Sequence, residues 1–86
     1  MDLAIPQALV DAVYDFIWTE YSTTGQRPAD INKVYRLVNE ITVGKVNTAR
    51  LTSMLLNQMI RAGEIEIQVE WTSRNNSTNG VVPLPR

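Results

Sequence analysis

The sequence predicts a mainly α-helical α+β domain in which three helices are followed by a small two-stranded β-hairpin. Three segments repeat apolar residues at helical spacing, and after Gly63 the apolar pattern changes to strict alternation. The chain has 86 residues, of which 44% are hydrophobic and 20% charged. This length and balance predict one folded domain over residues 1–86.

The first helix is expected over residues 6–22. Pro6 suits the first helical position, because a proline lacks the N–H that would be unpaired there. A stripe of apolar residues recurs at helical spacing: Val10, Tyr14, Ile17 and Tyr21. Further apolar residues widen this stripe: Leu9, Phe16 and Trp18. Because so wide an arc exceeds what one three-helix core needs, we expect these three residues to form a homodimer interface.

The second helix is expected over residues 30–41. Asp30 is a strong N-cap, since its carboxylate accepts hydrogen bonds from free N–H groups of the first turn. The apolar stripe predicted to be buried contains Ile31, Val34, Tyr35, Val38 and Ile41. Thr42 and Val43 are β-branched and Gly44 follows them, so the helix should end near Ile41.

The third helix is expected over residues 48–62. Asn47 or Thr48 can cap its start, and Gly63 is the residue type expected just past a helix end. The inner stripe contains Leu51, Leu55 and Met59, widened by Leu56 and Ile60. Polar residues fall together on the opposite face: Arg50, Ser53, Asn57 and Arg61.

The hairpin is expected over residues 64–84. Its first strand alternates between an apolar face, with Ile65, Ile67, Val69 and Trp71, and a polar face, with Glu64, Glu66, Gln68 and Glu70. Residues 73–80 are polar and predict a loop, after which residues 81–84 can return as a short strand. Pro83 and Pro85 lack N–H donors, so we expect this second strand to lie at an edge of the sheet or to fray quickly.

The stretch from Asn47 to Ile65 combines a capped helix, a Leu-x3-Leu spacing and a Gly-x-Ile start of a strand. In this respect the chain resembles the winged helix-turn-helix family, and the resemblance extends over residues 6–84. It implies three helices followed by a two-stranded wing, with the third helix as the DNA-reading helix. Two features depart from the family pattern. The link between residues 42 and 47 is long, and the first wing strand is acidic.

The charge is distributed unevenly along the chain. Residues 1–30 carry a net charge of −4, residues 31–63 carry +4 and residues 64–86 carry −1, which gives −1 in total. The positive charge therefore lies in the segment that a winged helix presents to DNA. Its carriers are Lys33, Arg36, Lys45, Arg50 and Arg61. Cations of this kind contact phosphates, and Arg, Asn and Ser side chains read base edges.

We therefore expect a small sequence-specific protein that binds double-stranded DNA, a transcriptional regulator or accessory factor that reads DNA with residues 48–62. The residues expected to contact DNA are Lys33, Arg36, Lys45, Asn47, Arg50, Ser53, Asn57, Arg61 and Arg74. The alternative is a winged-helix adaptor or inhibitor that binds a protein partner and no DNA. The net acidity and the Glu-rich strand favour this alternative.

Several classes of function are not expected. The chain has no cysteine and no histidine, so disulfides, thiolate or imidazole metal sites and the usual activators of Ser or Thr nucleophiles are missing. We expect no enzyme, no cofactor, no metal and no small-molecule substrate. No apolar run approaches the roughly 18 residues of a membrane helix, and Asp2 stands where a signal peptide carries basic charge. A cytoplasmic location without membrane contact is expected.

Overall fold

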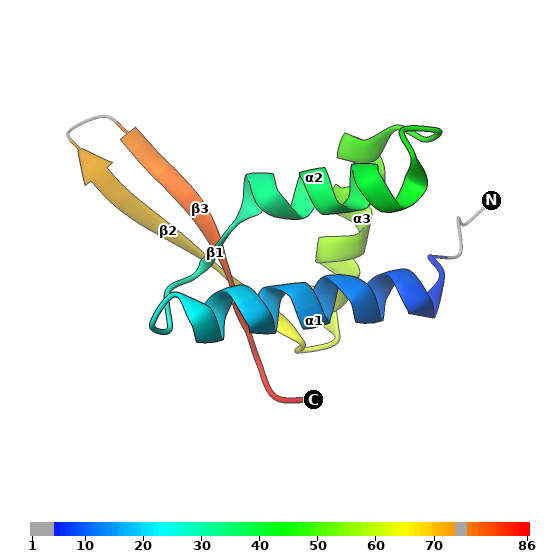
Figure 1. The fold of residues 1–86 in the computed structure, drawn as a ribbon. Coiled ribbons are helices and arrows are strands. Elements are labelled where there is room, and N and C mark those ends of the chain that lie inside the picture. Colours follow the sequence, from blue (N-terminus) through cyan, green and yellow to red (C-terminus); the bar gives the residue numbers. More distant parts are fainter. Residues whose placement is uncertain (1–4, 74–75) are drawn as a thin grey trace.

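The computed structural model describes residues 5–73 and 76–86, and within these it shows an α+β fold with three helices and a three-stranded antiparallel sheet (Figure 1). The elements are α1 (Gln7–Thr23), β1 (Ala29–Asp30), α2 (Ile31–Thr42), α3 (Thr48–Arg61), β2 (Ile65–Ser73) and β3 (Asn76–Pro83). Each of the three helices begins and ends within one residue of the predicted bounds. The side chains of residues 70–78 lie outside the description, including those of Glu70, Trp71 and Arg74.

The sheet has the order β1-β3-β2, so the last strand of the chain lies in the middle. The expectation that this strand lies at an edge is therefore wrong. Pro83 is nevertheless accommodated, because it ends β3 beyond the two positions where β1 pairs, which are Ala29 opposite Val81 and Asp30 opposite Gly80. Its missing N–H therefore interrupts no hydrogen bond to β1.

The hairpin is longer than the sequence predicts. β3 starts at Asn76 and pairs with β2 from Ile65 opposite Pro83 to Ser73 opposite Asn76, so most of the expected loop over residues 73–80 is strand. Strand formation depends more on pairing with a neighbouring strand than on local composition, which explains why a polar segment could be extended here. The two-residue strand β1 was also missed, because two residues are too few to show a periodicity.

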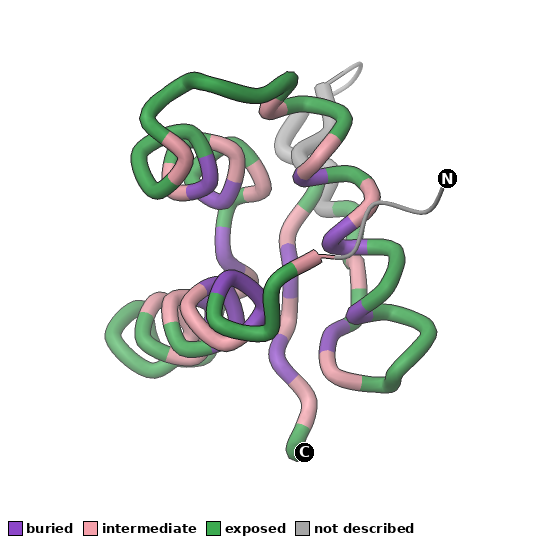
Figure 2. Tube along the Cα trace, turned by 90° about the vertical axis from the view of Figure 1, so that its right-hand side faces the viewer, coloured by how far each residue is buried: buried purple, intermediate pink, exposed green. Residues whose placement is uncertain are grey.

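The core lies between the three helices and one face of the sheet. Buried residues lie on the inward sides of the helices and on the strands (Figure 2). The buried apolar residues are Leu9, Val10, Val13, Tyr14, Ile17, Ala29, Val34, Val38, Leu55, Leu56, Met59, Ile65 and Val81. Leu55, in the predicted inner stripe of α3, is fully buried. One polar side chain, Thr52, is also fully buried, and its hydroxyl has no hydrogen-bond partner among the described residues.

Three residues predicted to face the core are exposed instead: Ile41, Ile60 and Val69. Val69 is 53% exposed because the outer part of the hairpin extends past the helices, as Figure 1 shows. Ile41 lies in the last turn of α2, and Ile60 in the last turn of α3. The ends of these helices therefore present apolar side chains to the surface.

The segment after β3 is fastened to α1. The hydroxyl of Tyr14 donates a hydrogen bond of 2.6 Å to the carbonyl oxygen of Leu84. Arg86 forms ion pairs with Asp11 at 2.8 Å and with Glu64 at 2.7 Å, and its guanidinium lies 4.2 Å from the centre of the Tyr14 ring. The hydrogen bond from the Gln7 side chain, together with Arg86, lowers the pKa of Asp11 below its usual value. These contacts hold the end of β3 and the start of β2 against α1.

We predict that Gly80→Ala destabilises the fold. A Cβ atom at this position would collide with the Cβ of Pro28, which directly precedes β1. The collision should push β1 away from β3 and lower the free energy of unfolding by about 1–3 kcal/mol, as overpacking does elsewhere. Urea denaturation of the parent and the variant measures this change.

The matched control is the double variant Gly80→Ala with Pro28→Gly, which removes the colliding atom. The two substitutions should show a favourable coupling in a double-mutant cycle, so the double variant should be more stable than the sum of the single effects indicates. Strictly additive effects would contradict a direct contact between these two residues.

Candidate nucleic-acid interface

The start of α3 is fixed by two side-chain hydrogen bonds. The side-chain oxygen of Asn47 accepts the backbone N–H of Arg50 at 3.1 Å, so Asn47 is the N-cap, one of the two residues that the sequence allows for this role. The hydroxyl of Thr48 donates to the side-chain oxygen of Asn39 at 3.0 Å. Because Asn39 belongs to α2, this second bond sets the first turn of α3 against the preceding helix. Buried Leu55 and Met59 then hold the inner side of α3 on the core.

The outer face of α3 carries the polar stripe that the sequence predicts. All four of its residues are exposed: Arg50, Ser53, Asn57 and Arg61. Within the described part of the chain, none of these four side chains donates or accepts a hydrogen bond, and neither arginine forms an ion pair. Eleven residues separate the two arginines, which corresponds to about 16 Å along the helix axis. The face is thus a row of solvated polar groups whose hydrogen-bonding capacity is free to bind a ligand.

The structure separates the two basic residues of α2 from this row. Lys33 forms an ion pair of 3.3 Å with Glu20 of α1. Lys33 and Arg36 line a shallow hollow of about 210 Å³ between α1 and α2, whose other lining residues are Phe16, Glu20, Leu37 and Glu40. The sequence shows that these cations cluster along the chain, but the helical period of α2 places them in the hollow with Glu20 of α1 and Glu40 of α2. The expected basic surface is therefore divided into two parts.

The remaining residues of the expected interface have different positions. Lys45 is exposed in the turn between α2 and α3. The oxygen of the Asn47 side chain is engaged in capping, so this residue positions the helix. Arg74 lies outside the described residues. The part that the structure brings together consists of Lys45 and the four residues on the outer face of α3.

Sequence reasoning missed an apolar groove next to Arg50. It has a volume of about 430 Å³ and is formed by the segment before α1, the turn between α2 and α3, and the first half of α3. Its lining includes Ile5, Val46, Leu51 and Met54. These residues come from separate parts of the chain, so no local pattern could reveal the groove. Val46, an apolar residue inside the predicted turn, was the one local signal of it among the residues described.

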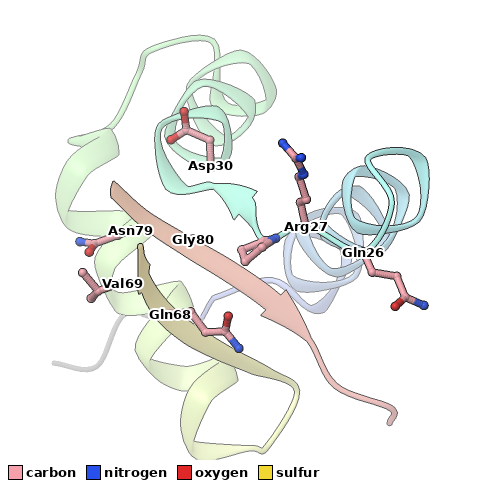
Figure 3. A pocket seen from close by; sticks show the side chains of 8 residues that line it. Gln26, Arg27, Asp30, Gln68, Val69, Asn79 and Gly80 are labelled. Atoms are coloured by element: carbon pink, nitrogen blue, oxygen red, sulfur yellow. The ribbon is translucent and has the colours of Figure 1, made fainter. Parts of the chain in front are cut away.

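A larger hollow lies elsewhere, where the loop before β1 passes the hairpin. It measures about 610 Å³, and its lining includes Gln26, Arg27, Asp30, Gln68 and Asn79. Figure 3 shows that these side chains point in different directions rather than toward a common point. The carboxylate of Asp30 accepts the backbone N–H of Asn32 at 2.9 Å and is thus used as a helix cap. Since binding sites need polar groups that converge, this hollow is a poor candidate.

The described residues include no cluster of three or more acidic side chains that could hold a metal ion. None of the helices in that part of the chain has the length and apolar character needed to cross a membrane. No family model matches the sequence, no curated protein is significantly similar to it, and no solved structure matches it significantly.

Proposed function

We propose that this protein is a small sequence-specific DNA-binding domain, a transcriptional regulator or accessory factor of the cytoplasm, that inserts α3 into the major groove. The observation that carries the proposal is the exposed outer face of α3, where Arg50, Ser53, Asn57 and Arg61 have no structural partner among the described residues. An α-helix fits the major groove, and these residue types contact base edges and phosphates.

The order of the elements supports this proposal. A helix pair joined by a turn precedes a long hairpin, and this layout is compatible with a winged-helix domain in which β2 and β3 form the wing. One of the wing's acidic residues is engaged within the fold. Glu64 is paired with Arg86, which neutralises one carboxylate at the base of β2. Glu66 remains exposed on that strand.

A homodimer would strengthen so small an interface, because two linked modules bind with a higher effective concentration. Of the three residues expected at a dimer interface, two are used within the chain itself. Leu9 is buried in the chain's own core, and the Trp18 ring packs edge-on against Tyr14 and Tyr21 of the same helix. Phe16 remains half-exposed in the hollow between α1 and α2, which carries both cations and acids. We propose that this hollow packs against its copy in a second chain.

The second candidate function is a protein-binding adaptor that does not bind DNA. Two of the five cations in the expected basic segment, Lys33 and Arg36, lie beside Glu20 and Glu40, and the whole chain carries a net charge of −1. A salt titration with random duplex separates the two functions. A DNA-binding protein loses affinity steeply as salt rises, whereas an adaptor shows little binding at any salt concentration.

We predict different effects of Arg50→Ala and Arg61→Ala on DNA binding. A recognition helix reads bases mainly with its N-terminal residues, so Arg50 should read a base and Arg61 should contact a phosphate. Arg50→Ala should cost roughly 1–3 kcal/mol on the preferred site and relax the sequence preference. Arg61→Ala should weaken all duplexes alike and reduce the salt slope by about one. Fluorescence anisotropy on specific and random duplexes measures both effects.

Lys33→Ala is the matched control when parent and variant are compared at concentrations below those at which the proposed dimer forms, since Lys33 is paired with Glu20 away from α3. It should leave DNA affinity nearly unchanged. If the parent binds neither duplex at low salt, the DNA proposal fails and the adaptor remains. If Lys33→Ala weakens binding as much as Arg50→Ala does, the DNA-binding face has been assigned to the wrong side of the molecule.

We predict that the protein is a dimer at high concentration and that Phe16→Glu converts it to a folded monomer. The substitution removes the aromatic side chain from the proposed contact and replaces it with a carboxylate that would have to lose its hydration on association, which opposes dimer formation. Sedimentation equilibrium on both proteins, with circular dichroism as the check of folding, measures the result. A parent that stays monomeric at high concentration would show that the apolar arc of α1 serves the core alone.

A further inference from the structure

The corner between α2 and α3, defined here as residues 41–46, exposes three apolar side chains in a short stretch. Val43 is 75% exposed, and Ile41 and Val46 are each 46% exposed. Single exposed apolar residues are ordinary, but a cluster of them beside an apolar groove marks an interaction surface. The corner therefore differs from the polar loops elsewhere in the described chain, such as residues 24–27.

Val43 is also conformationally strained. It ends α2 with φ of 55° and ψ of 31°, in the left-handed region that β-branched residues rarely adopt. Gly or Asn would serve the helix end more easily at this position, because both adopt this conformation with less strain. Burial of the Val43 side chain offsets little of this strain, since the residue is 75% exposed. A strained and exposed apolar residue of this kind indicates a binding role.

The groove described above is continuous with the corner, because Val46 belongs to both. Half-buried Ile5, Leu51 and Met54 supply apolar surface within it, and exposed Val46 and Arg50 complete the lining on the side of the turn. The exposed apolar surface of the corner thus adjoins the apolar groove at the N-terminal end of α3. Amphipathic helices bind to grooves of this kind through apolar residues spaced three and four apart.

The charge around this region is positive. Among the described residues, Arg50 is the one charged residue that lines the groove, and Lys45 is exposed in the corner itself. Glu40, the nearest acid along the chain, lines the separate hollow beside Phe16. The N-terminal end of α3 adds a partial positive charge through the helix dipole. A complementary partner must therefore carry acidic residues around an apolar centre.

We propose that the corner and its groove bind an acidic amphipathic helix of a partner protein. The apolar side of that helix covers Val43 and Val46 and fills the groove against Leu51 and Met54, and its carboxylates pair with Lys45 and Arg50. This surface does not depend on DNA binding by α3. If α3 also binds DNA, the two ligands compete, because Arg50 belongs to both surfaces.

The experiment is a display selection of random 16-residue peptides on the full chain without DNA, followed by affinity measurements on the enriched peptides. The selection should enrich peptides with a net negative charge and apolar residues at positions i, i+3 or i+4, and i+7. Met54→Glu, which places a carboxylate in the groove, should weaken their binding at least tenfold. Arg50→Glu should weaken acidic peptides and favour versions in which the acids are replaced by lysine.

Val69→Asp is the matched control, because Val69 is a similarly exposed apolar residue on the hairpin. It should leave peptide affinity unchanged. Val43→Asn should raise the melting temperature, since it relieves strain, and yet weaken peptide binding severalfold. A purely structural role of Val43 would not produce a rise in stability together with a loss of peptide affinity.

The proposal is overturned if the selection enriches no peptides, or enriches basic ones. It is also overturned if Met54→Glu binds the enriched peptides as the parent does. If the parent forms dimers and Val46→Asp converts them to monomers, a second copy of this chain occupies the groove. That result would also overturn the proposal of an acidic partner helix. None of these outcomes depends on whether the protein binds DNA, so failure of this proposal is distinct from failure of the DNA proposal.

Discussion

The pairing of β3 with both β1 and β2 fixes the geometry of the candidate interface. β1 ends at Asp30, which is also the N-cap of α2, and β2 begins at Ile65, shortly after α3 ends at Arg61. Because β3 binds to both of these strands, it fixes the position of the start of α2 relative to the end of α3. Fully buried Val81 lies opposite Ala29 on one side and opposite Ile67 on the other. Pro28 approaches Gly80 so closely that position 80 must lack a side chain.

The sequence was sufficient for those parts of the fold that depend on local patterns. The helices were predicted because capping residues such as Asp30 and Asn47 mark their starts, and both caps form hydrogen bonds in the structure. β1 and the full length of β3 were not predicted. Their residues become strands only by pairing with segments distant in the sequence, as Ala29 does with Val81. Long-range pairing of this kind leaves no local periodicity for the sequence to show.

The candidate site shows the same division between local and long-range information. The outer face of α3 was predicted correctly as an exposed polar stripe, because helical spacing alone decides which residues share it. The wider basic surface was not predicted correctly, because a count of charges along the chain ignores the direction in which the side chains of α2 point. Lys33 points toward Glu20, thirteen positions earlier in the chain, and no pattern within α2 reveals that pair. The groove beside Arg50 likewise appears only when three segments meet.

The proposed functions assign different ligands to different sides of α3, and amide chemical shifts of the ¹⁵N-labelled protein can locate the DNA side directly. We expect addition of a short random-sequence duplex at low salt to shift the amides of Arg50, Ser53, Asn57 and Arg61 most strongly. The amides of Phe16 and Lys33, in the hollow between α1 and α2, should move little. The account is contradicted if the duplex shifts no amide at low salt, or if the largest shifts occur around Phe16 and Lys33.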